Sequence, residues 1–516
     1  GWMSVPDTAC IRKQDGNALS RMGLYGFLAV YNSLTIFLQE EVNPMSDSNG
    51  HAVFTHNKNI YDDPTRYFPQ DTNVYLCIDL KSFYASVECV ERGLDPMTAK
   101  LVVADPERSK GTICLAVSPA LKALGVKNRC RIYEIPDGVD YITAPPQMQH
   151  YIDCSAEIYG VYLQYIAKED IHVYSIDEAF LDVTSYLSLY KMTAKELGIE
   201  IMAAIHDRTG IRATCGIGTN LYLCKVALDI TAKHSPDFIG ILTEDTYKAT
   251  LWEHKPLTDF WQVGPGTANR LARYGIFTMG AIAKTAKKDE DFFYRLFGVN
   301  AEILIDHANG TEPVRMADIK NYKGKEKSLS SGQVLMRDYS YMEALTVAKE
   351  MMQELCMDLT KKGLVTASIT LHVSYSHNWK DRYGMPAAHS HGTISVPHAT
   401  DDASVWLKKI HALYVRAVRN GIPIRRINIT CNHVVPAQES ASSFQFSLFD
   451  TEGRFTEDIC SSVEEQDRNH RLQEALLEVR RRYGKNAVLK GIDLEEAATG
   501  RERNLQIGGH KSGTIE

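Results

Sequence analysis

Two adjacent carboxylates, Asp177 and Glu178, interrupt an otherwise apolar segment, "HVYSIDEAFLDVT" at residues 172–184. Like charges side by side repel each other, and burying either one is costly unless it is paired or holds a metal ion. A surface turn is the ordinary alternative, because 64 acidic residues among 516 make chance pairs common. The pair therefore indicates either a turn or a metal site, and other carboxylates decide between the two.

A third carboxylate, Asp79, ends the apolar strand predicted for "NVYLCIDL". It stands alone among apolar residues, where a single buried acid is otherwise unfavourable. Two aromatic residues, Phe83 and Tyr84, follow it closely. A two-metal site for phosphoryl transfer needs at least three carboxylates. Asp79 with Asp177 and Glu178 meets that need and has the layout of a polymerase palm.

The composition is that of a globular protein, with 44% apolar and 23% charged residues and a net charge of -7. The eleven cysteines are scattered and include no C-x-x-C pair, which favours reduced thiols in the cytoplasm over a zinc ribbon or a disulfide scaffold. The apolar stretch at 23–38 contains polar residues and is short for a membrane span. A signal peptide is the other interpretation of this stretch, and the cysteine pattern disfavours it. We therefore expect no membrane partner.

Strands and helices alternate up to about residue 250, which predicts a mixed α/β domain. Short helices follow, and a second α/β unit begins near Lys325, with apolar alternation in "TASITLHVSYS" and "RRINITCNHVV". Residues 321–435 hold fifteen lysines and arginines against nine aspartates and glutamates. The tail after Pro436 is polar, and helical spacing of Leu472, Ala475, Leu476 and Val479 predicts one helix in it.

"CIDLKSFYASVE" and "YSIDEAFLDVT", in this order, resemble the bacterial Y-family (UmuC-like) translesion DNA polymerases, and the resemblance runs from about Val74 to Pro436. It implies an α/β (α+β) multidomain right hand with palm, fingers, helical thumb and a separate α/β little finger. The implied domains are an N-terminal extension (1–72), for which disorder is one expectation, the palm (73–95 and 146–250), the fingers (96–145), the thumb (251–320), the little finger (321–436) and a polar tail (437–516).

The resemblance also implies roles for the carboxylates. Asp79 and Asp177 would bridge two Mg²⁺ ions, and Glu178 would join them at the ion that lowers the pKa of the primer 3′-hydroxyl. The backbone carbonyl of Leu80 is similar to the usual oxygen ligand of the nucleotide-bound ion. Such hard oxygen ligands suit Mg²⁺. Tyr84 matches the steric-gate position, whose ring excludes a 2′-hydroxyl.

Nucleotide contacts are implied for Phe83, Tyr84, Lys122 and Lys233. Lys122, in "SPALKALGV", stands where many family members carry arginine, so it offers charge without a bidentate fork. Pro119 stands where tyrosine is common, which puts one usual phosphate hydrogen bond in doubt. Lys225 and Lys233 match two lysines of a palm helix, and Lys233 is the better phosphate ligand by resemblance. The alternative for each lysine is a solvated helix residue.

DNA contacts are expected from two regions. "WQVGPGTANRLARYGI" resembles a helix-hairpin-helix, whose Gly-rich turn presents backbone N–H groups to a phosphate. The alternative interpretation of this motif is a plain helix–turn–helix corner. The second region is the basic little finger, whose positive charges could instead form an ordinary solvated face. The expected DNA-binding residues are Val263, Gly264, Gly266 and Thr267 of the hairpin motif, and Lys325, Lys327, Arg337, Arg425 and Arg426 of the little finger.

"QFSLFD" resembles the peptide by which bacterial polymerases bind the sliding clamp (the beta subunit), with Gln445, Leu448 and Phe449 as its contacts. The function expected is a low-fidelity, template-directed DNA polymerase that copies past damage, using primer–template DNA and deoxynucleoside triphosphates. Accessory subunits are left open. Two rival functions are a nucleotide cyclase, which needs neither the hairpin motif nor a basic final domain, and a degenerate polymerase acting in recruitment, which would have lost a carboxylate.

Overall fold

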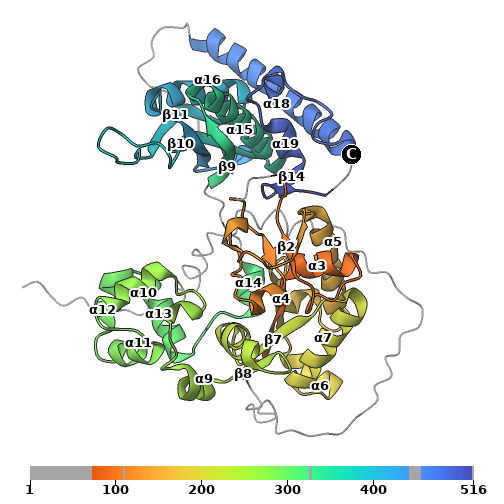
Figure 1. The fold of residues 1–516 in the computed structure, drawn as a ribbon. Helices are drawn as coiled ribbons and strands as arrows, with labels where there is room; N and C mark the ends of the chain where they lie inside the picture. The colour runs from red at the N-terminus through yellow and green to blue at the C-terminus, as the bar shows by residue number, and fades with distance from the viewer. Residues whose placement is uncertain (1–71, 108–110, 323, 325–327, 441–454, 514–516) are drawn as a thin grey trace, which may run out of the picture. The chain divides into compact units, whose positions relative to one another are not determined.

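The structure is a computed structural model that describes residues 72–107, 111–322, 324, 328–440 and 455–513. The chain divides into two compact units between residues 323 and 324 (Figure 1). Each unit combines helices with its own β-sheet, which confirms the predicted α/β multidomain class. None of the described helices is both long enough and apolar enough to cross a membrane.

A five-stranded sheet forms the centre of the first unit. All neighbouring strands are antiparallel except the last two, which are parallel. The strand order is β5 (Ile171–Ser175), β6 (Glu178–Asp182), β1 (Tyr75–Leu80), β7 (Ala213–Gly218) and β8 (Ile239–Leu242).

Glycines let one helix lie unusually close to this sheet. A Cβ at Gly216 would lie 2.1 Å from the Cys224 carbonyl oxygen, and one at Gly218 would lie 2.2 Å from the Cys224 nitrogen. Only glycine permits such a close backbone approach. The helices of this region are α3 (Phe83–Glu91), α5 (Met148–Tyr162), α6 (Thr184–Tyr190), α7 (Ala194–Thr209) and α8 (Leu221–Val226), which a π-helical turn, Ala227–Thr231, continues.

Two smaller parts complete the first unit. One is a three-stranded sheet in the order β3 (Ala116–Val117), β2 (Leu101–Val103) and β4 (Ile142–Ala144), with the short helix α4 (Pro119–Ala123). The other is helical, and its core continues into α8 and the π-helical turn, which contribute Tyr222, Val226 and Ile230. Its helices are α9 (Glu244–Leu251), α10 (Pro265–Ala272), α11 (Met279–Ala286), α12 (Glu290–Phe297) and α13 (Asn300–Asn309). The next helix, α14 (Met316–Asn321), packs against β5 of the central sheet.

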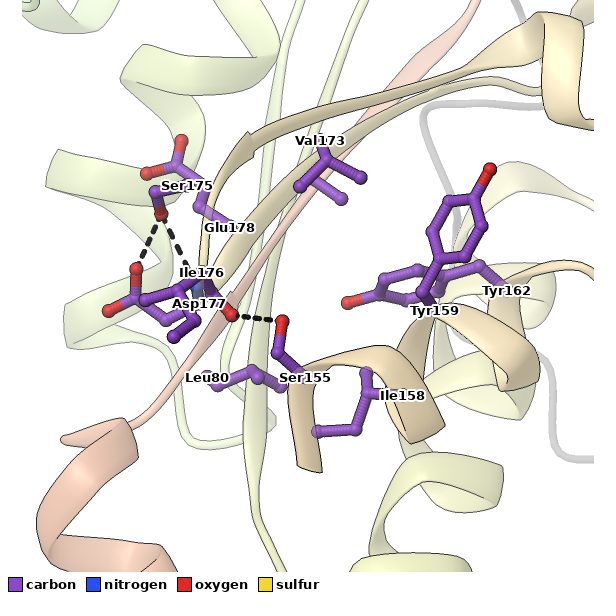
Figure 2. A pocket seen from close by; sticks show the side chains of 11 residues that line it. Leu80, Ser155, Ile158, Tyr159, Tyr162, Val173, Ser175, Ile176, Asp177 and Glu178 are labelled. Carbon is purple, nitrogen blue, oxygen red and sulfur yellow. Dashed lines mark hydrogen bonds between the residues drawn. The ribbon is translucent and has the colours of Figure 1, made fainter. Parts of the chain in front are cut away.

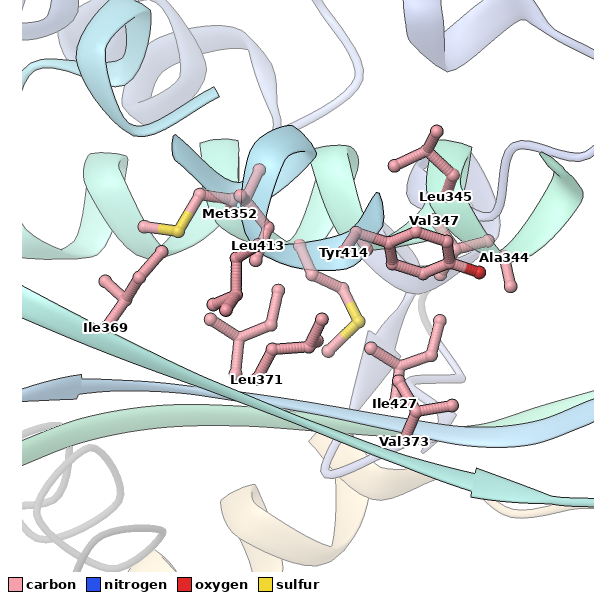
Figure 3. Close-up of a cluster of buried hydrophobic side chains, with 14 of the residues drawn as sticks. Ala344, Leu345, Val347, Met352, Ile369, Leu371, Val373, Leu413, Tyr414 and Ile427 are labelled. Carbon is pink, nitrogen blue, oxygen red and sulfur yellow. The ribbon is translucent and has the colours of Figure 1, made fainter. Parts of the chain in front are cut away.

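The second unit is an antiparallel sheet with helices on one face, and Figure 3 shows the apolar side chains between the two layers. Along the central strand, Ile369, Leu371 and Val373 point into this core while polar residues alternate with them. The sheet order is β11 (Ser390–Thr400), β10 (Leu364–Tyr375), β12 (Ile424–Asn432) and β9 (Ser328–Tyr339), with β13 (Val435–Pro436) beside β10; the helices are α15 (Tyr341–Lys362) and α16 (Ala403–Ala417).

The C-terminal residues of the second unit pack on α15. The predicted helix in this segment is present, but Leu472 is 58% exposed whereas Gln473 is 4% exposed. The Gln473 amide donates to the Thr360 hydroxyl (2.7 Å) and accepts from the Ala403 N–H (3.0 Å). The elements here are α17 (Ala437–Ser440), α18 (Phe455–Tyr483), α19 (Gly500–Asn504), β14 (Gln506–Ile507) and β15 (His510–Lys511).

Candidate active site

Strand pairing brings the three predicted carboxylates to one end of the central sheet. Asp79, at the end of β1, is the register partner of Glu178, the first residue of β6. The Leu80 N–H donates to the Asp177 carbonyl at 2.8 Å. Figure 2 shows Leu80, Asp177 and Glu178 around the turn that enters β6. Residues about 100 positions apart in the sequence are therefore neighbours here because two strands pair.

The negative charges of this cluster are not balanced. Burial, followed by the neighbouring carboxylates Asp177 and Glu178, raises the pKa of Asp79 to about 8. Burial also raises the pKa of Glu178, although Lys225 acts in the opposite direction. A raised carboxyl pKa means that the folded chain resists placing another negative charge at this position.

Lys225 partly neutralises the cluster. Its ammonium nitrogen lies 2.9 Å from a Glu178 carboxylate oxygen and 3.1 Å from Asp229 on the π-helical turn. Burial alone lowers the pKa of Lys225, but Glu178, Cys77 and Asp229 outweigh burial and raise it. The close approach of α8 to β7 places this lysine under the carboxylates. Sequence analysis recognised Lys225 as a palm-helix lysine but did not foresee that it would pair with Glu178.

The carboxylates do not form a closed metal-binding cage in this arrangement. Within the part of the chain that the structure describes, no three His, Cys, Asp or Glu side chains are grouped closely enough to hold a metal ion. Glu178 faces Lys225 and the Cys77 thiol, and Asp177 accepts a hydrogen bond from Ser175. The donor set nevertheless fits a hard divalent cation, since it is made of carboxylate oxygens whose mutual repulsion a bound cation would relieve.

A small hollow lies beside the acidic turn, between β5, β6 and α5 (Figure 2). Its wall is fixed by the Ser155 hydroxyl, which donates to the Ile176 carbonyl at 2.6 Å. That bond holds the backbone immediately before Asp177. The hollow is lined by Leu80, Ser155, Ile158, Tyr159, Tyr162, Val173, Ser175, Ile176, Asp177, Glu178 and Ala179.

Three lysines, Lys81, Lys122 and Lys233, lie near the carboxylates. Lys122, for which a phosphate contact is predicted, lies on α4. Its ammonium group donates to the Ser82 hydroxyl at 2.8 Å. Burial lowers the pKa of Lys81 and Lys122, and the nearby Lys233 lowers both further, whereas Asp79 raises them. Lys81 was missed in the sequence analysis, although it follows directly on the strand that carries Asp79.

The two aromatic candidates differ in exposure. Tyr84 is half-buried and stacks on Tyr151 of α5, with ring centroids 4.5 Å apart. Phe83 is only 2% exposed, so its ring packs in the core and does not face an open site.

Lys233, the other predicted nucleotide contact, is held only loosely by an ion pair. Its charged nitrogen lies 4.0 Å from Asp229, and 63% of its side chain is exposed. Lys233 is therefore accessible to a phosphate.

The Gly-rich turn of the predicted hairpin motif leads into α10. Gly264 caps the helix, and a Cβ at either Gly264 or Gly266 would meet no atom within 4 Å. The turn is therefore open around these two glycines. The N–H groups of Gly266 and Thr267 lie in the first turn of the helix and lack a partner four residues earlier in it. Val263 is 5% exposed and belongs to the helical core, so its side chain anchors the turn.

The predicted little-finger contacts are unequally placed. Arg337 pairs with Glu343 at 2.6 Å and lies over the Tyr339 ring. Arg425 lies 3.8 Å from Asp338, whereas Arg426 is exposed. Five predicted contacts lie outside the described residues, namely Lys325, Lys327, Gln445, Leu448 and Phe449.

Comparison with known proteins places this site in a family. Residues 78–229 match the model of the impB/mucB/samB family, and residues 326–448 match the C-terminal domain of that family. A Bacillus subtilis protein named for UV-damage repair, UvrX, is 29% identical over 448 residues, which cover 85% of this chain and 97% of the relative. DNA polymerase IV 2 of Bacillus subtilis is 27% identical and is covered to 98%.

The fold also has a counterpart among solved structures. A Y-family DNA polymerase chimera of Dbh and Dpo4 superposes with a TM-score of 0.52, covering 70% of this chain and 99% of the chimera at 19% identity. The matched segments include Asp79, Asp177 and Glu178 together with the second sheet. This chain belongs to the impB/mucB/samB family, the UmuC-like Y-family of DNA polymerases.

Proposed function

We propose that this chain is a template-directed DNA polymerase of low fidelity that copies past damaged DNA. It adds deoxynucleotides to a primer 3′ end. The observation that carries the proposal is the meeting of Asp79, Asp177 and Glu178 at the end of paired strands, with lysines beside them. Relatives named DNA polymerase IV, such as those of Bacillus subtilis, support this activity.

The carboxylates are proposed to hold two Mg²⁺ ions, together with the backbone carbonyl of Leu80. When bound there, Mg²⁺ lowers the pKa of a hydroxyl nucleophile and stabilises charge on transferring phosphate oxygens. To serve as a ligand, Glu178 would exchange its ion pair with Lys225 for a contact with Mg²⁺, and Lys225 would stay paired with Asp229. Lys225 thus keeps the acidic cluster folded and leaves Glu178 able to turn.

The nucleotide is proposed to lie between the carboxylates and the lysines. Lys81, Lys122 and Lys233 would neutralise the triphosphate. Burial first, and then neighbouring cations, lower the pKa of Lys81 and Lys122, and a bound triphosphate would offset the repulsion between these cations. Tyr84, held by its stack on Tyr151, would limit space at the sugar. Pro119 at the start of α4 offers no N–H to a phosphate.

Primer–template DNA is proposed to bind at two places. The N–H groups of Gly266 and Thr267 at the start of α10 suit a backbone phosphate, because helix N-termini carry partial positive charge. Arg426 on the second sheet supplies an exposed cation. Both contacts read the sugar–phosphate backbone and not the base sequence, as copying any template requires.

Primer extension with Mg²⁺ across an undamaged and a lesion-containing template tests this proposal. Asp177→Asn keeps the size of the side chain but removes its charge, and we expect a loss of about a thousandfold or more in nucleotide addition, roughly 4 kcal/mol of transition-state stabilisation. DNA binding should persist because phosphate contacts lie elsewhere. Asp207→Asn, an exposed residue of α7, is the matched control. Extension by Asp177→Asn at the wild-type rate would refute the site.

Tethering to the sliding clamp is proposed through Gln445, Leu448 and Phe449. A clamp raises the effective concentration of a polymerase at the primer end. Replacing both Leu448 and Phe449 with Ala should weaken clamp binding by more than about tenfold, or roughly 1.4 kcal/mol, because two large apolar side chains no longer fill a pocket. The control is Leu472→Ala, an exposed leucine of α18. Equal clamp affinity in the double variant and the wild type would contradict the assignment.

A further inference from the structure

One face of the sheet in the second unit is polar. Leu371 and Val373 of β10 point into the core, so Thr370 and the other side chains between them point the opposite way. Thr370 stands opposite Thr393 of β11, and their hydroxyls lie 2.8 Å apart. Asn432 of β12 donates to Thr370 at 2.9 Å. Hydroxyl and amide groups thus run across neighbouring strands on the face that turns away from α15 and α16.

Three histidines gather on this face. His372 is the register partner of His391 on β11, and its ring centroid lies 5.2 Å from that of His389. On the other side β12 carries Arg426, which is exposed. Burial, His389, His391 and Arg426 together lower the pKa of His372. At neutral pH the His372 ring is therefore uncharged and able to take up a proton.

The charged groups around the histidines are mostly cationic. Arg416 on α16 and Arg419 just after it donate to backbone carbonyls at the β11 side of the sheet. The carboxylate at the β9 corner, Asp338, is held by Ser376 at 2.7 Å and lies 3.8 Å from Arg425. Among the described residues, no Asp or Glu forms an ion pair with any of the three histidines. The described residues of this unit therefore supply no carboxylate as a counter-ion for these histidines when they are protonated.

We infer that His372, His389 and His391 form a proton-linked contact to the sugar–phosphate backbone of duplex DNA. Charge complementarity identifies the occupant, because residues 321–435 carry fifteen cations against nine anions in a chain of net charge -7. Arginine, hydroxyl and amide groups are the usual partners of DNA phosphates. The inference rests on the DNA polymerase function proposed above and adds that DNA affinity depends on pH through this cluster.

The direction of the pH effect follows from linkage. A phosphate beside the cluster favours charged imidazolium and raises the histidine pKa on binding. DNA binding then takes up protons, so affinity increases as the pH falls through the ordinary range of histidine titration. A rise of about one pKa unit in two or three histidines corresponds to roughly five- to tenfold tighter binding at pH 6.0 than at pH 7.5.

The test measures binding of the full chain to a fluorescent primer–template duplex at pH 6.0 and 7.5 and at constant ionic strength. The wild type should bind about five- to tenfold more tightly at pH 6.0. The triple variant His372→Gln, His389→Gln and His391→Gln should lose most of this ratio. His411→Gln, an exposed histidine of α16 on the other side of the sheet, should keep it.

A second measurement needs no variant. If protonated histidines meet phosphates, the slope of log affinity against log salt concentration for the wild type should be steeper at pH 6.0 by about one to two. A wild-type affinity that does not change with pH, or a folded triple variant that keeps the full ratio, would overturn the inference while leaving the polymerase intact. Failure to bind duplex DNA at either pH would instead contradict the proposed function together with this inference.

Discussion

Two carboxylate sites, one in each unit, are built in opposite ways. In the second unit, Glu350 of α15 is 2% exposed and accepts the backbone N–H groups of Thr499 at 2.9 Å and Gly500 at 3.0 Å. In the first unit, the Asp79 carboxylate accepts no hydrogen bond from the described residues, and it lies beside two further carboxylates. Backbone N–H groups of the chain therefore donate hydrogen bonds to Glu350, whereas no described group donates one to Asp79.

The difference in hydrogen bonding distinguishes a structural carboxylate, Glu350, which we call the anchor, from a carboxylate available to a ligand, Asp79. A buried carboxylate whose hydrogen bonds are all made within the chain fixes the segments that donate to it. Gly500 shows how tight that contact is, because a Cβ there would lie 2.8 Å from a Glu350 oxygen. A carboxylate held among like charges stores unfavourable energy that a bound cation releases. The contrast supports a folding role for Glu350 and the proposed ligand role for Asp79.

A large loss of stability is expected when the anchor, Glu350, is changed. Glu350→Gln places an amide group where two N–H donors need acceptors, so we expect a loss of about 1–3 kcal/mol in the free energy of unfolding. Urea unfolding followed by circular dichroism measures it, with Glu474→Gln, whose side chain is 61% exposed, as the control. Primer extension at a temperature where the variant is folded should be little changed. Wild-type stability in Glu350→Gln would show that the two sites are alike.

The acidic site could be predicted because its signal is local and chemical. Asp79 and the pair at 177 and 178 stand in apolar segments where a charge is unexpected, and strand pairing then brings strand ends together. The α/β multidomain class could also be predicted, because predicted strands and helices alternate along the chain. The lysine partners were harder to predict, since Lys225 reaches Glu178 only because glycines of β7 admit α8 against the sheet.

The C-terminal segment shows where patterning fails. Helical spacing correctly predicted a helix around Leu472, yet that leucine is exposed and the neighbouring Gln473 is buried. The helix docks through hydrogen bonds to Thr360 and Ala403, which lie about 70 to 110 residues away in the chain. Apolar periodicity contains no information on a polar contact of this kind, so the packing of this segment on α15 was not predicted.

The remaining prediction concerns the sign of the stability change caused by replacing Asp79. Because its folded pKa, about 8, exceeds the ordinary value of about 4, the folded chain holds a proton that the unfolded chain releases. Stability contributed by this group therefore falls as the pH rises from about 4 toward 8. Replacing Asp79 with Asn removes that penalty, so in EDTA at neutral pH the variant should be more stable than the wild type.

Thermal unfolding of the wild type and Asp79→Asn, each in EDTA and in excess Mg²⁺, tests most directly whether this cluster is built for cations. We predict that Asp79→Asn unfolds at a higher temperature than the wild type in EDTA. Mg²⁺ should stabilise the wild type, since a ligand that binds only the folded state raises its stability, and should stabilise the variant far less. A variant less stable than the wild type in EDTA, or an equal response of both proteins to Mg²⁺, would contradict the account.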